Sequence, residues 1–253
     1  MPEPVCITYF TDPLCPWCWA FEPQWRRLRT EFAAGIRWRY RMGGLLSGWD
    51  RYHDPVNEVH NPGQMAVQWR EVGALTGTPI DPSIWRTADA PSSSYPACLA
   101  VKAAESFGPA VAETYLRRVR EAVMLEGRDV SRPDVLLDLC VAAGAEPAAF
   151  EAALEGPEAT AAFRDDLTEA RYHEVRRFPT LVLHRSGPMG LVLVGCRPYE
   201  ALEEAVTRIA PDLQPRRLEG AAGLAQYAAD WGRVTAHELA ANFGIASGRV
   251  PGD

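Results

Sequence analysis

The sequence lacks a long hydrophobic run, an excess of positive charge and a basic segment at its start. No stretch approaches the roughly 18 consecutive apolar residues of a membrane-spanning helix. The formal net charge of -7 argues against a nucleic-acid surface and against an anionic membrane as partner. The opening residues, "MPEPVCITYF", contain neither the basic region nor the small-residue cleavage site of a secretory signal. We therefore expect a cytosolic protein without nucleic-acid or membrane partners.

Internal repeats and low-complexity segments are also absent. The chain has 253 residues, of which 47% are hydrophobic and 23% charged, and this is the composition of an ordinary globular protein. The length suits one large domain or two small ones, with a sizeable buried core.

The chain has six cysteines. In a reducing compartment, a framework of structural disulfides is improbable. Cys6, in a strand-like run, and Cys140, in the apolar helix "DVLLDLCVAAGA", are interpreted as buried thiols. Cys98 and Cys196 fall in segments that we place near the candidate site. The remaining two, Cys15 and Cys18, form a CxxC motif.

The pattern along the chain predicts a sheet interrupted by helices. Residues 5–10 and 36–42 have the composition of strands and enclose a helix with apolar residues at helical spacing, which indicates a βαβ unit with a parallel crossover. A loop or lid over 47–65 and a helix-rich block over about 62–172 follow. Two further strands joined by "SGPM", and then the helix "RPYEALEEAVTRIA", complete the pattern.

This order predicts an α/β protein with a thioredoxin fold, an inserted helical domain and a C-terminal helical tail. We expect the first part of the thioredoxin fold over 1–60, the insertion over 61–172, the second part over 173–211 and the tail over 212–253. The end of the tail has the rhythm of the first helix and turn of a helix-turn-helix. Its arginines do not outnumber its acids, so we favour a packing appendage or an oligomer contact.

The motif "CPWC" lies between the first strand and the first helix, where a redox dithiol is expected. Unpaired N–H groups and the helix dipole favour negative charge there, so we expect Cys15 to be an exposed nucleophile with a stabilised thiolate. Cys18, one turn into the helix, is close enough to attack the mixed disulfide and resolve it. Pro16 has no N–H to leave unpaired and begins the helix with a fixed φ.

The motif has two alternatives to a redox dithiol. A zinc site normally needs a second pair of Cys or His ligands, and the chain has no second CxxC and no HxxxH, so we expect no metal. An inert, structural CxxC is the other alternative. The position of the motif between strand and helix favours redox chemistry over both.

A proline far along the chain supports the redox interpretation. In "VRRFPTLVL", Pro179 stands directly before a predicted strand. A cis peptide there, opposite the CxxC, would expose the backbone of the preceding residue to a peptide substrate that pairs as an added strand. A trans proline that merely begins the strand is the alternative, and we expect cis.

The segments "FTDPLCPWCW", "SSSYPACLAVKAAESFG" and "FPTLVL" together resemble the DsbA-like branch of the thioredoxin superfamily, over residues 5 to 210. Two cytosolic subgroups are most similar: FrnE-like oxidoreductases and the adaptors that present the regulator Spx to a ClpXP protease. The resemblance implies a nucleophile at Cys15, a resolving cysteine at Cys18 and a cis-proline at Pro179. The periplasmic oxidase has a histidine where this chain has Trp17, so a strongly oxidising potential is not expected.

Substrate contacts are expected on both sides of the dithiol. The resemblance implies them for Phe178 and Thr180, which flank the proline, and for the dipeptide Pro16-Trp17. An apolar rim of Trp17, Trp19 and the "GWDRY" loop for an unfolded peptide is a further hypothesis, with simple packing as the alternative.

Two carboxylates are candidate proton acceptors for the resolving cysteine. Asp12 lies three residues before Cys15, and Glu22 lies one helical turn after Cys18. The alternatives are a strand-ending turn residue for Asp12 and a solvated helix position for Glu22.

The segment "SSSYPACL" raises a third possibility. In the related kappa-type glutathione transferases and hydroxychromene carboxylate isomerases, the helical insert helps to bind the thiol cofactor, and serine stands where this chain has Cys15. Ser93, Ser94 and Cys98 either line a cleft or serve capping and core packing, with Ser94 a plausible N-cap.

We therefore predict a thiol–disulfide oxidoreductase or isomerase that acts on protein or peptide thiols. It needs no cofactor beyond its own Cys15–Cys18 disulfide, with glutathione a possible redox partner. The alternatives are a binding adaptor of the Spx type and a glutathione-dependent isomerase. The sequence does not determine the direction of exchange or the oligomeric state.

Overall fold

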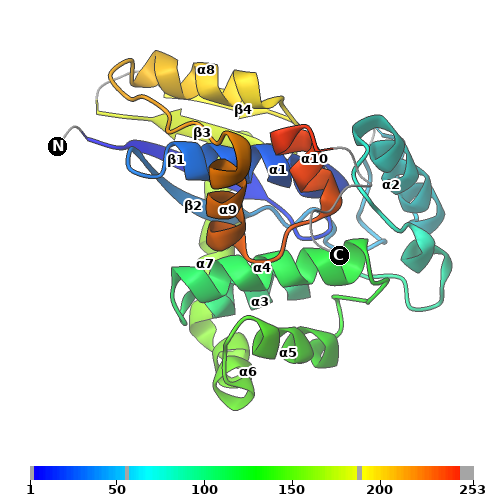
Figure 1. Cartoon of the computed structure of the whole chain (residues 1–253). Helices are drawn as coiled ribbons and strands as arrows, with labels where there is room; N and C mark the ends of the chain where they lie inside the picture. Colours follow the sequence, from blue (N-terminus) through cyan, green and yellow to red (C-terminus); the bar gives the residue numbers. More distant parts are fainter. Residues whose placement is uncertain (1–2, 55–56, 187–189, 246–253) are drawn as a thin grey trace. The chain divides into compact units, whose positions relative to one another are not determined.

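The computed structural model describes residues 3–54, 57–186 and 190–245 (Figure 1). Contacts divide the chain into two compact units. The first unit contains residues 1–9, 20–40 and 179–253, and the second contains 10–19 and 41–178. The domain limits predicted from the sequence stay predictions.

The described strands form one sheet in the order β2-β1-β3-β4. These strands are β1 (Val5–Thr11), β2 (Ile36–Met42), β3 (Thr180–His184) and β4 (Gly190–Val194). The Val5 N–H donates to the Gly35 carbonyl at 2.9 Å, and the Gly43 N–H donates to the Thr11 carbonyl at 2.7 Å. β1 and β2 therefore run in the same direction, which confirms the parallel crossover. β3 and β4 pair antiparallel, with Thr180 opposite Val194, whereas residues 187–189 of the predicted hairpin turn lie outside the described residues.

The first unit has an aromatic core on β1 and α1 (Pro16–Glu31). The ring of Tyr9 meets those of Phe21 and Trp25 edge-on, with centroid distances of 5.7 and 5.2 Å. α8 (Tyr199–Ile209) packs on β3 and β4. Helix α1 ends at Glu31, four residues before Gly35. Gly35 allows a close approach, because a Cβ there would lie 2.1 Å from a methyl carbon of Leu213.

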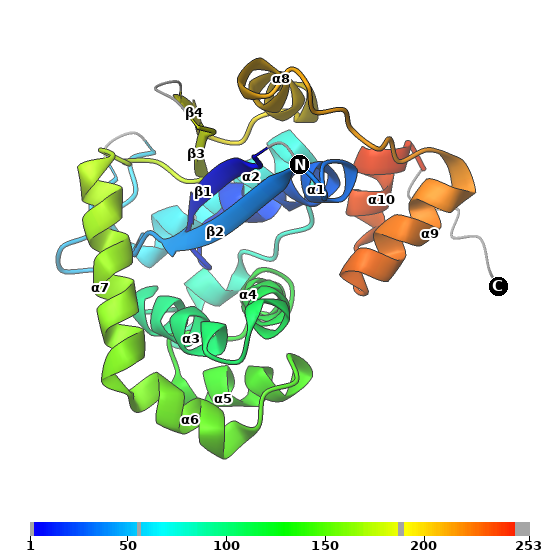
Figure 2. The same ribbon diagram turned by 90° about the vertical axis from the view of Figure 1, so that its left-hand side faces the viewer.

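Two tail helices, α9 (Gly220–Trp231) and α10 (Ala236–Phe243), pack on each other (Figure 2). They are also tied to α1 by hydrogen bonds. The Trp231 indole donates to the Thr30 hydroxyl at 3.0 Å, and the Asn242 amide donates to the Pro23 carbonyl at 3.1 Å. The tail therefore packs against this unit, as the appendage interpretation predicted.

The second unit is mainly helical, which confirms the predicted helix-rich block. It contains α2 (Pro62–Thr76), the 3₁₀ helix η1 (Ser83–Arg86), α3 (Tyr95–Glu105), α4 (Pro109–Met124), α5 (Pro133–Ala142), α6 (Pro147–Glu155) and α7 (Pro157–Tyr172). Helix α3 packs on α4, α5, α6 and α7 (Figure 2). No helix among the described residues is both long and apolar enough to cross a bilayer.

Candidate dithiol active site

The two cysteines of the CPWC motif lie where β1 passes into α1, in the second unit. β1 ends at Thr11, and the turn that follows is closed by the Cys15 N–H, which donates to the Asp12 carbonyl at 3.2 Å. The Cys18 N–H donates to Cys15 Sγ at 3.2 Å. Both cysteines are free thiols. The helix N-terminus therefore presents a reduced pair with one backbone donor already directed at the first sulfur.

Both thiols are buried, which differs from the expectation of an exposed nucleophile. Cys15 is 3% exposed and Cys18 is 0% exposed. The Cys15 thiol donates to the Phe178 carbonyl oxygen at 3.7 Å. Burial, and after it the charge of Asp54, raises the pKa of the phenol of Tyr52, which lies in the loop before α2.

Burial and mutual contact shift the pKa values of the two thiols. Burial raises the pKa of the Cys15 thiol well above its ordinary value, and the neighbouring Cys18 sulfur raises it further. Burial acts in the same direction on Cys18, but the Cys15 thiol, the charge of Arg120 and the Thr11 hydroxyl outweigh it, so the Cys18 pKa is lowered. The stabilised Cys15 thiolate expected from the sequence stays a prediction.

The carboxylate of Asp12 is fully buried and accepts hydrogen bonds at both oxygens. Oδ1 accepts from the Leu14 N–H at 2.9 Å, while Oδ2 accepts from the Leu45 N–H at 2.7 Å and from the Ser94 hydroxyl at 2.9 Å. The Cys98 thiol donates to Oδ2 at 3.4 Å. Burial raises the pKa of this carboxyl. The contact between Asp12 and Cys18 is made by the backbone N–H of Asp12 and not by this carboxylate. Its role as a proton acceptor stays a prediction.

The serines before α3 join the inserted helices to this carboxylate. Ser94 occupies the N-cap position, but its side chain makes no capping bond. Its hydroxyl accepts from the Leu46 N–H at 3.1 Å and donates to Asp12. The Ser93 hydroxyl accepts from the Tyr95 N–H at 3.1 Å in its place. Cys98 is buried beside the same carboxylate, and its thiol pKa is raised well above the ordinary value by burial and by the Asp12 charge.

The segment from Phe178 to Thr180 presents a backbone carbonyl to the dithiol. Phe178 is half-buried, and its ring lies so close to Gly43 that a Cβ there would be 2.0 Å from Phe178 Cζ. Pro179 follows Phe178 directly, and its carbonyl accepts from the Gly195 N–H at 2.7 Å. Thr180 is buried at the start of β3. The cis peptide and the substrate-binding roles of these residues stay predictions.

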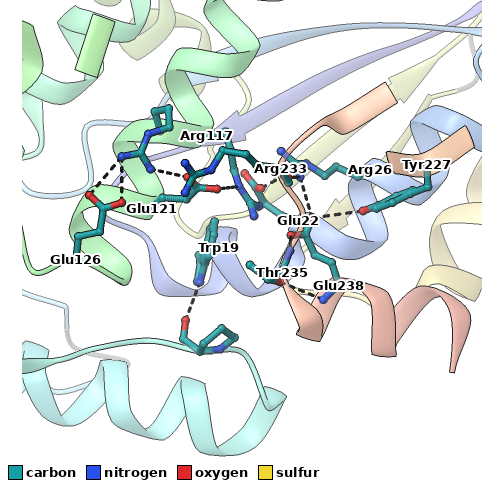
Figure 3. A network of polar contacts seen from close by, with 12 residues as sticks. Trp19, Glu22, Arg26, Arg117, Glu121, Glu126, Tyr227, Arg233, Thr235 and Glu238 are labelled. Atoms are coloured by element: carbon teal, nitrogen blue, oxygen red, sulfur yellow. Dashed lines mark hydrogen bonds and ion pairs between the residues drawn. The ribbon is translucent and has the colours of Figure 1, made fainter. Parts of the chain in front are cut away.

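The aromatic residues of the proposed rim differ in their surroundings. Trp17 is half-buried and Pro16 is buried. Trp19 is buried, and its indole donates to the Pro79 carbonyl at 3.0 Å, with the Arg117 guanidinium 4.3 Å from its ring centroid (Figure 3). Trp19 therefore packs within the second unit. Trp49 of the "GWDRY" loop donates to the Pro91 carbonyl at 3.0 Å.

The other candidate carboxylate, Glu22, belongs to the first unit. It is 5% exposed, so the alternative of a solvated helix position is wrong. Its carboxylate lies 3.6 Å from the Arg26 guanidinium, one helical turn further along α1. Its role as a proton acceptor stays a prediction.

The sequence interpretation overlooked Thr11 and Arg120. Both are buried, and an Arg120 Nη2–H donates to the Thr11 hydroxyl oxygen. Arg120 lies in α4, four residues after Leu116 and three before Val123, so a charged residue stands on the apolar stripe of the helix. This break in the stripe is a signal that could have identified Arg120. No signal of this kind marks Thr11.

Comparison with known proteins agrees with this fold. A family model described as thioredoxin matches residues 9–204. The chain belongs to the thioredoxin family. Within this family, it is 31% identical over 218 residues to the ClpXP adapter protein SpxH of Halalkalibacterium halodurans, covering 84% of this chain and 71% of the relative.

Solved structures share the fold of this thioredoxin-family chain. It is similar to the cytosolic disulfide reductase DsbM of Pseudomonas aeruginosa, with 25% identity, a TM-score of 0.64 and coverage of 81% of this chain and 100% of DsbM. A probable DsbA oxidoreductase of Streptomyces coelicolor has the same fold, with 20% identity and a TM-score of 0.63 over 86% of this chain and 94% of that structure.

Proposed function

We propose that this protein is a cytosolic thiol–disulfide oxidoreductase that acts on protein or peptide thiols through Cys15 and Cys18. The observation that carries the proposal is the free dithiol at the start of α1, with Cys15 Sγ 3.7 Å from the Phe178 carbonyl oxygen. A carbonyl at this position suits the added-strand mode of peptide binding, because it accepts a hydrogen bond from the substrate backbone beside the reacting sulfur.

The reductive direction begins at Cys15. Cys15 loses its proton to water, and the resulting Cys15 thiolate attacks a substrate disulfide, from which one substrate sulfur leaves as thiolate. Cys18 then attacks Cys15 Sγ and transfers its proton to the departing second substrate sulfur. The substrate is reduced to two thiols, and the protein holds the Cys15–Cys18 disulfide. The reverse sequence oxidises a substrate dithiol, and glutathione is a suitable partner to restore the dithiol.

The likeness to DsbM supports this proposal, because that protein is described as a cytosolic disulfide reductase. The same likeness supports a cytosolic location.

A second candidate is an adaptor that binds a protein partner for degradation. It is favoured by the curated relatives, which are named as ClpXP adapters and reach 31% identity. In this candidate, the dithiol has no turnover and the insert serves to bind the partner.

The experiment is reduction of insulin and reshuffling of a scrambled disulfide protein, with glutathione as co-substrate. We expect turnover by the wild type, loss of turnover in Cys15→Ser and accumulation of a mixed disulfide in Cys18→Ser. Cys6→Ser, in half-buried Cys6 on β1, is the control and is expected to keep its rate. Absence of turnover by the folded wild type over a range of glutathione potentials would replace the enzyme proposal with the adaptor.

A further inference from the structure

Asp12 joins three segments of the second unit that lie far apart in the sequence. Its side chain is 0% exposed. Oδ1 accepts from the Leu14 N–H at 2.9 Å, in the turn that carries Cys15. Oδ2 accepts from the Leu45 N–H at 2.7 Å, in the loop after β2, and from the Ser94 hydroxyl at 2.9 Å, at the start of α3. One carboxylate therefore connects the turn of the CPWC motif, the loop after β2 and the first turn of α3.

The four groups that bond to this carboxylate are neutral donors. Besides the two N–H groups and the Ser94 hydroxyl, the Cys98 thiol donates to Oδ2 at 3.4 Å. The Ser94 oxygen accepts from the Leu46 N–H at 3.1 Å, and its single hydrogen is used for Asp12. An ionised carboxylate only accepts, so it suits all four donors at once. Because a buried polar group without a partner is costly, a shift of one segment strains the bonds to the other two.

Two of the joined segments also border the contact between the dithiol and the Phe178 carbonyl. In the turn, the Cys15 N–H donates to the Asp12 carbonyl at 3.2 Å. In the loop, Gly43 lies against the Phe178 ring, since a Cβ there would be 2.0 Å from Cζ. Between these two segments, Cys15 Sγ and the Phe178 carbonyl oxygen are 3.7 Å apart. Asp12 therefore holds the turn on one side of this contact and the loop on the other.

We propose that Asp12 is a positioning residue of the dithiol site, which aligns Cys15 Sγ with the Phe178 carbonyl by binding the turn, the loop and α3 together. This inference rests on the proposed function and concerns its specificity for peptides. In this role Asp12 exchanges no proton with the substrate or the dithiol. A peptide disulfide whose backbone pairs with Phe178 gains from the alignment, whereas a small disulfide without a backbone does not.

Two probes measure this difference in a Cys18→Ser background, which isolates the first covalent step. Each probe is a mixed disulfide of pyridine-2-thiol, formed in one case with the cysteine of a short extended peptide and in the other with 2-mercaptoethanol. Cys15 loses its proton to water, and its thiolate attacks the peptide or mercaptoethanol sulfur. The new bond to Cys15 forms, the probe disulfide breaks, and pyridine-2-thiolate leaves with the electron pair and is followed by its absorbance. A Cys15→Ser, Cys18→Ser double variant supplies the baseline for the other cysteines.

The expected change is in the ratio of the peptide rate to the small-probe rate. The two probes share a leaving group, so this ratio isolates the contribution of the peptide backbone. We expect Asp12→Asn to lower it about fivefold, the effect of roughly one lost hydrogen bond. The amide has one oxygen and one NH₂ group, so a donor then faces either the Leu14 or the Leu45 N–H. A smaller folded fraction would slow both probes equally and leave the ratio unchanged.

Glu31→Gln is the matched control for loss of a buried carboxylate. Glu31 is 2% exposed and also accepts from a hydroxyl, that of Tyr199 at 2.6 Å, and from a backbone N–H, that of Leu218 at 3.3 Å. It lies 13 residues further along α1 than Cys18, roughly 20 Å at the rise of a helix. This variant should lose stability and keep the wild-type ratio.

Two neighbouring serines separate the contact with Asp12 from other contacts of the same loop. Ser94→Ala removes the hydroxyl that binds Asp12 and should lower the ratio. Ser93→Ala removes a hydroxyl that donates to the Leu46 carbonyl at 2.9 Å, and it should retain the ratio. If Asp12→Asn does not fold, this pair of variants decides the question.

Amide hydrogen exchange tests the junction without any substrate. In Asp12→Asn we expect faster exchange in all three joined segments together, at residues 14–18, 45–46 and 94–98. Glu31→Gln should keep the wild-type exchange rates in these segments. Faster exchange at 14–18 alone would overturn this inference, because the carboxylate would then not join the segments.

The rate ratio gives further outcomes that would overturn the inference. These are an unchanged ratio in folded Asp12→Asn, an equal fall in Glu31→Gln, and equal ratios in Ser94→Ala and Ser93→Ala. The proposed function fails in a different way. No reaction of Cys15 with either probe would refute the proposed function, whereas reaction with both probes at an unchanged ratio in Asp12→Asn would refute only this inference.

Discussion

Glu238 in α10 and Arg26 in α1 form a buried ion pair that holds the C-terminal tail in the first unit (Figure 3). The Arg26 Nη1 and Glu238 Oε1 atoms are 2.9 Å apart, and the two side chains are 4% and 3% exposed. The other Glu238 oxygen accepts from the Thr235 N–H at 2.8 Å and completes the capping box of α10. Glu238→Gln keeps an acceptor for this cap and removes the charge.

Removing one member of a buried ion pair costs about 3–5 kcal/mol, because the other charge stays buried. Arg26 retains three other contacts: Glu22 at 3.6 Å, the Arg233 carbonyl at 3.2 Å and the Trp231 ring, whose centroid is 4.7 Å away. We therefore expect the lower end of the range, about 3 kcal/mol. This free energy raises the equilibrium for local opening of α9 and α10 roughly 150-fold.

Amide hydrogen exchange over residues 220–243, measured on the full chain, tests this prediction. Glu203→Gln is the control, because the Glu203–Arg217 pair of the same unit is 25% and 42% exposed and such pairs contribute about 0–1 kcal/mol. We expect faster exchange across the tail helices in Glu238→Gln and little change in the control. A change of less than about fivefold in Glu238→Gln would show that the tail is held by other contacts, and the reasoning from the ion pair would be refuted.

Two further predictions follow from individual contacts. Gly43→Ala should destabilise the protein by about 1–3 kcal/mol and slow thiol exchange, because the new Cβ would displace the ring of Phe178, the residue whose backbone carbonyl contacts Cys15. Thermal unfolding and turnover measure these effects. Gly190→Ala is the control that should be tolerated, since the nearest atom to its new Cβ is 3.4 Å away. The pKa of Glu146 is lowered by hydrogen bonds from the Ala148 and Ala149 N–H groups, so its contribution to stability is complete above its ordinary value of 4.5 and is lost as the pH falls through the folded pKa. Acid unfolding of Glu146→Gln should lack this pH dependence. A difference in stability between wild type and variant that is the same at every pH would contradict the prediction.

The elements that could be predicted from the sequence depend on neighbours close in the chain. Helix α2 begins after Asn61, whose side chain accepts from the Gln64 N–H, and ends at Gly77 in the left-handed conformation with φ of 72°. Strand β2 has the predicted bounds of residues 36–42. The CPWC motif begins α1 for the same local reason, since a proline suits the first turn of a helix.

The charges around the dithiol could not be predicted in this way. Arg120 is 102 residues from Cys18 in the chain and reaches it only because α4 packs in the same unit. Asp12 was identified as a candidate, but its partners Leu45, Ser94 and Cys98 come from distant segments. Burial is likewise a property of the whole unit, and it changed the expected state of Cys15.

The sequence by itself determined that this is a thioredoxin-fold protein with a dithiol between its first strand and first helix, because strand and helix periodicity and the spacing of two cysteines are local properties. Only the tertiary structure decided that both thiols of that dithiol are buried and which groups surround them. A pKa depends on burial and on charges within a few ångströms, and the chain brings those groups to Cys18 from positions far apart in its sequence.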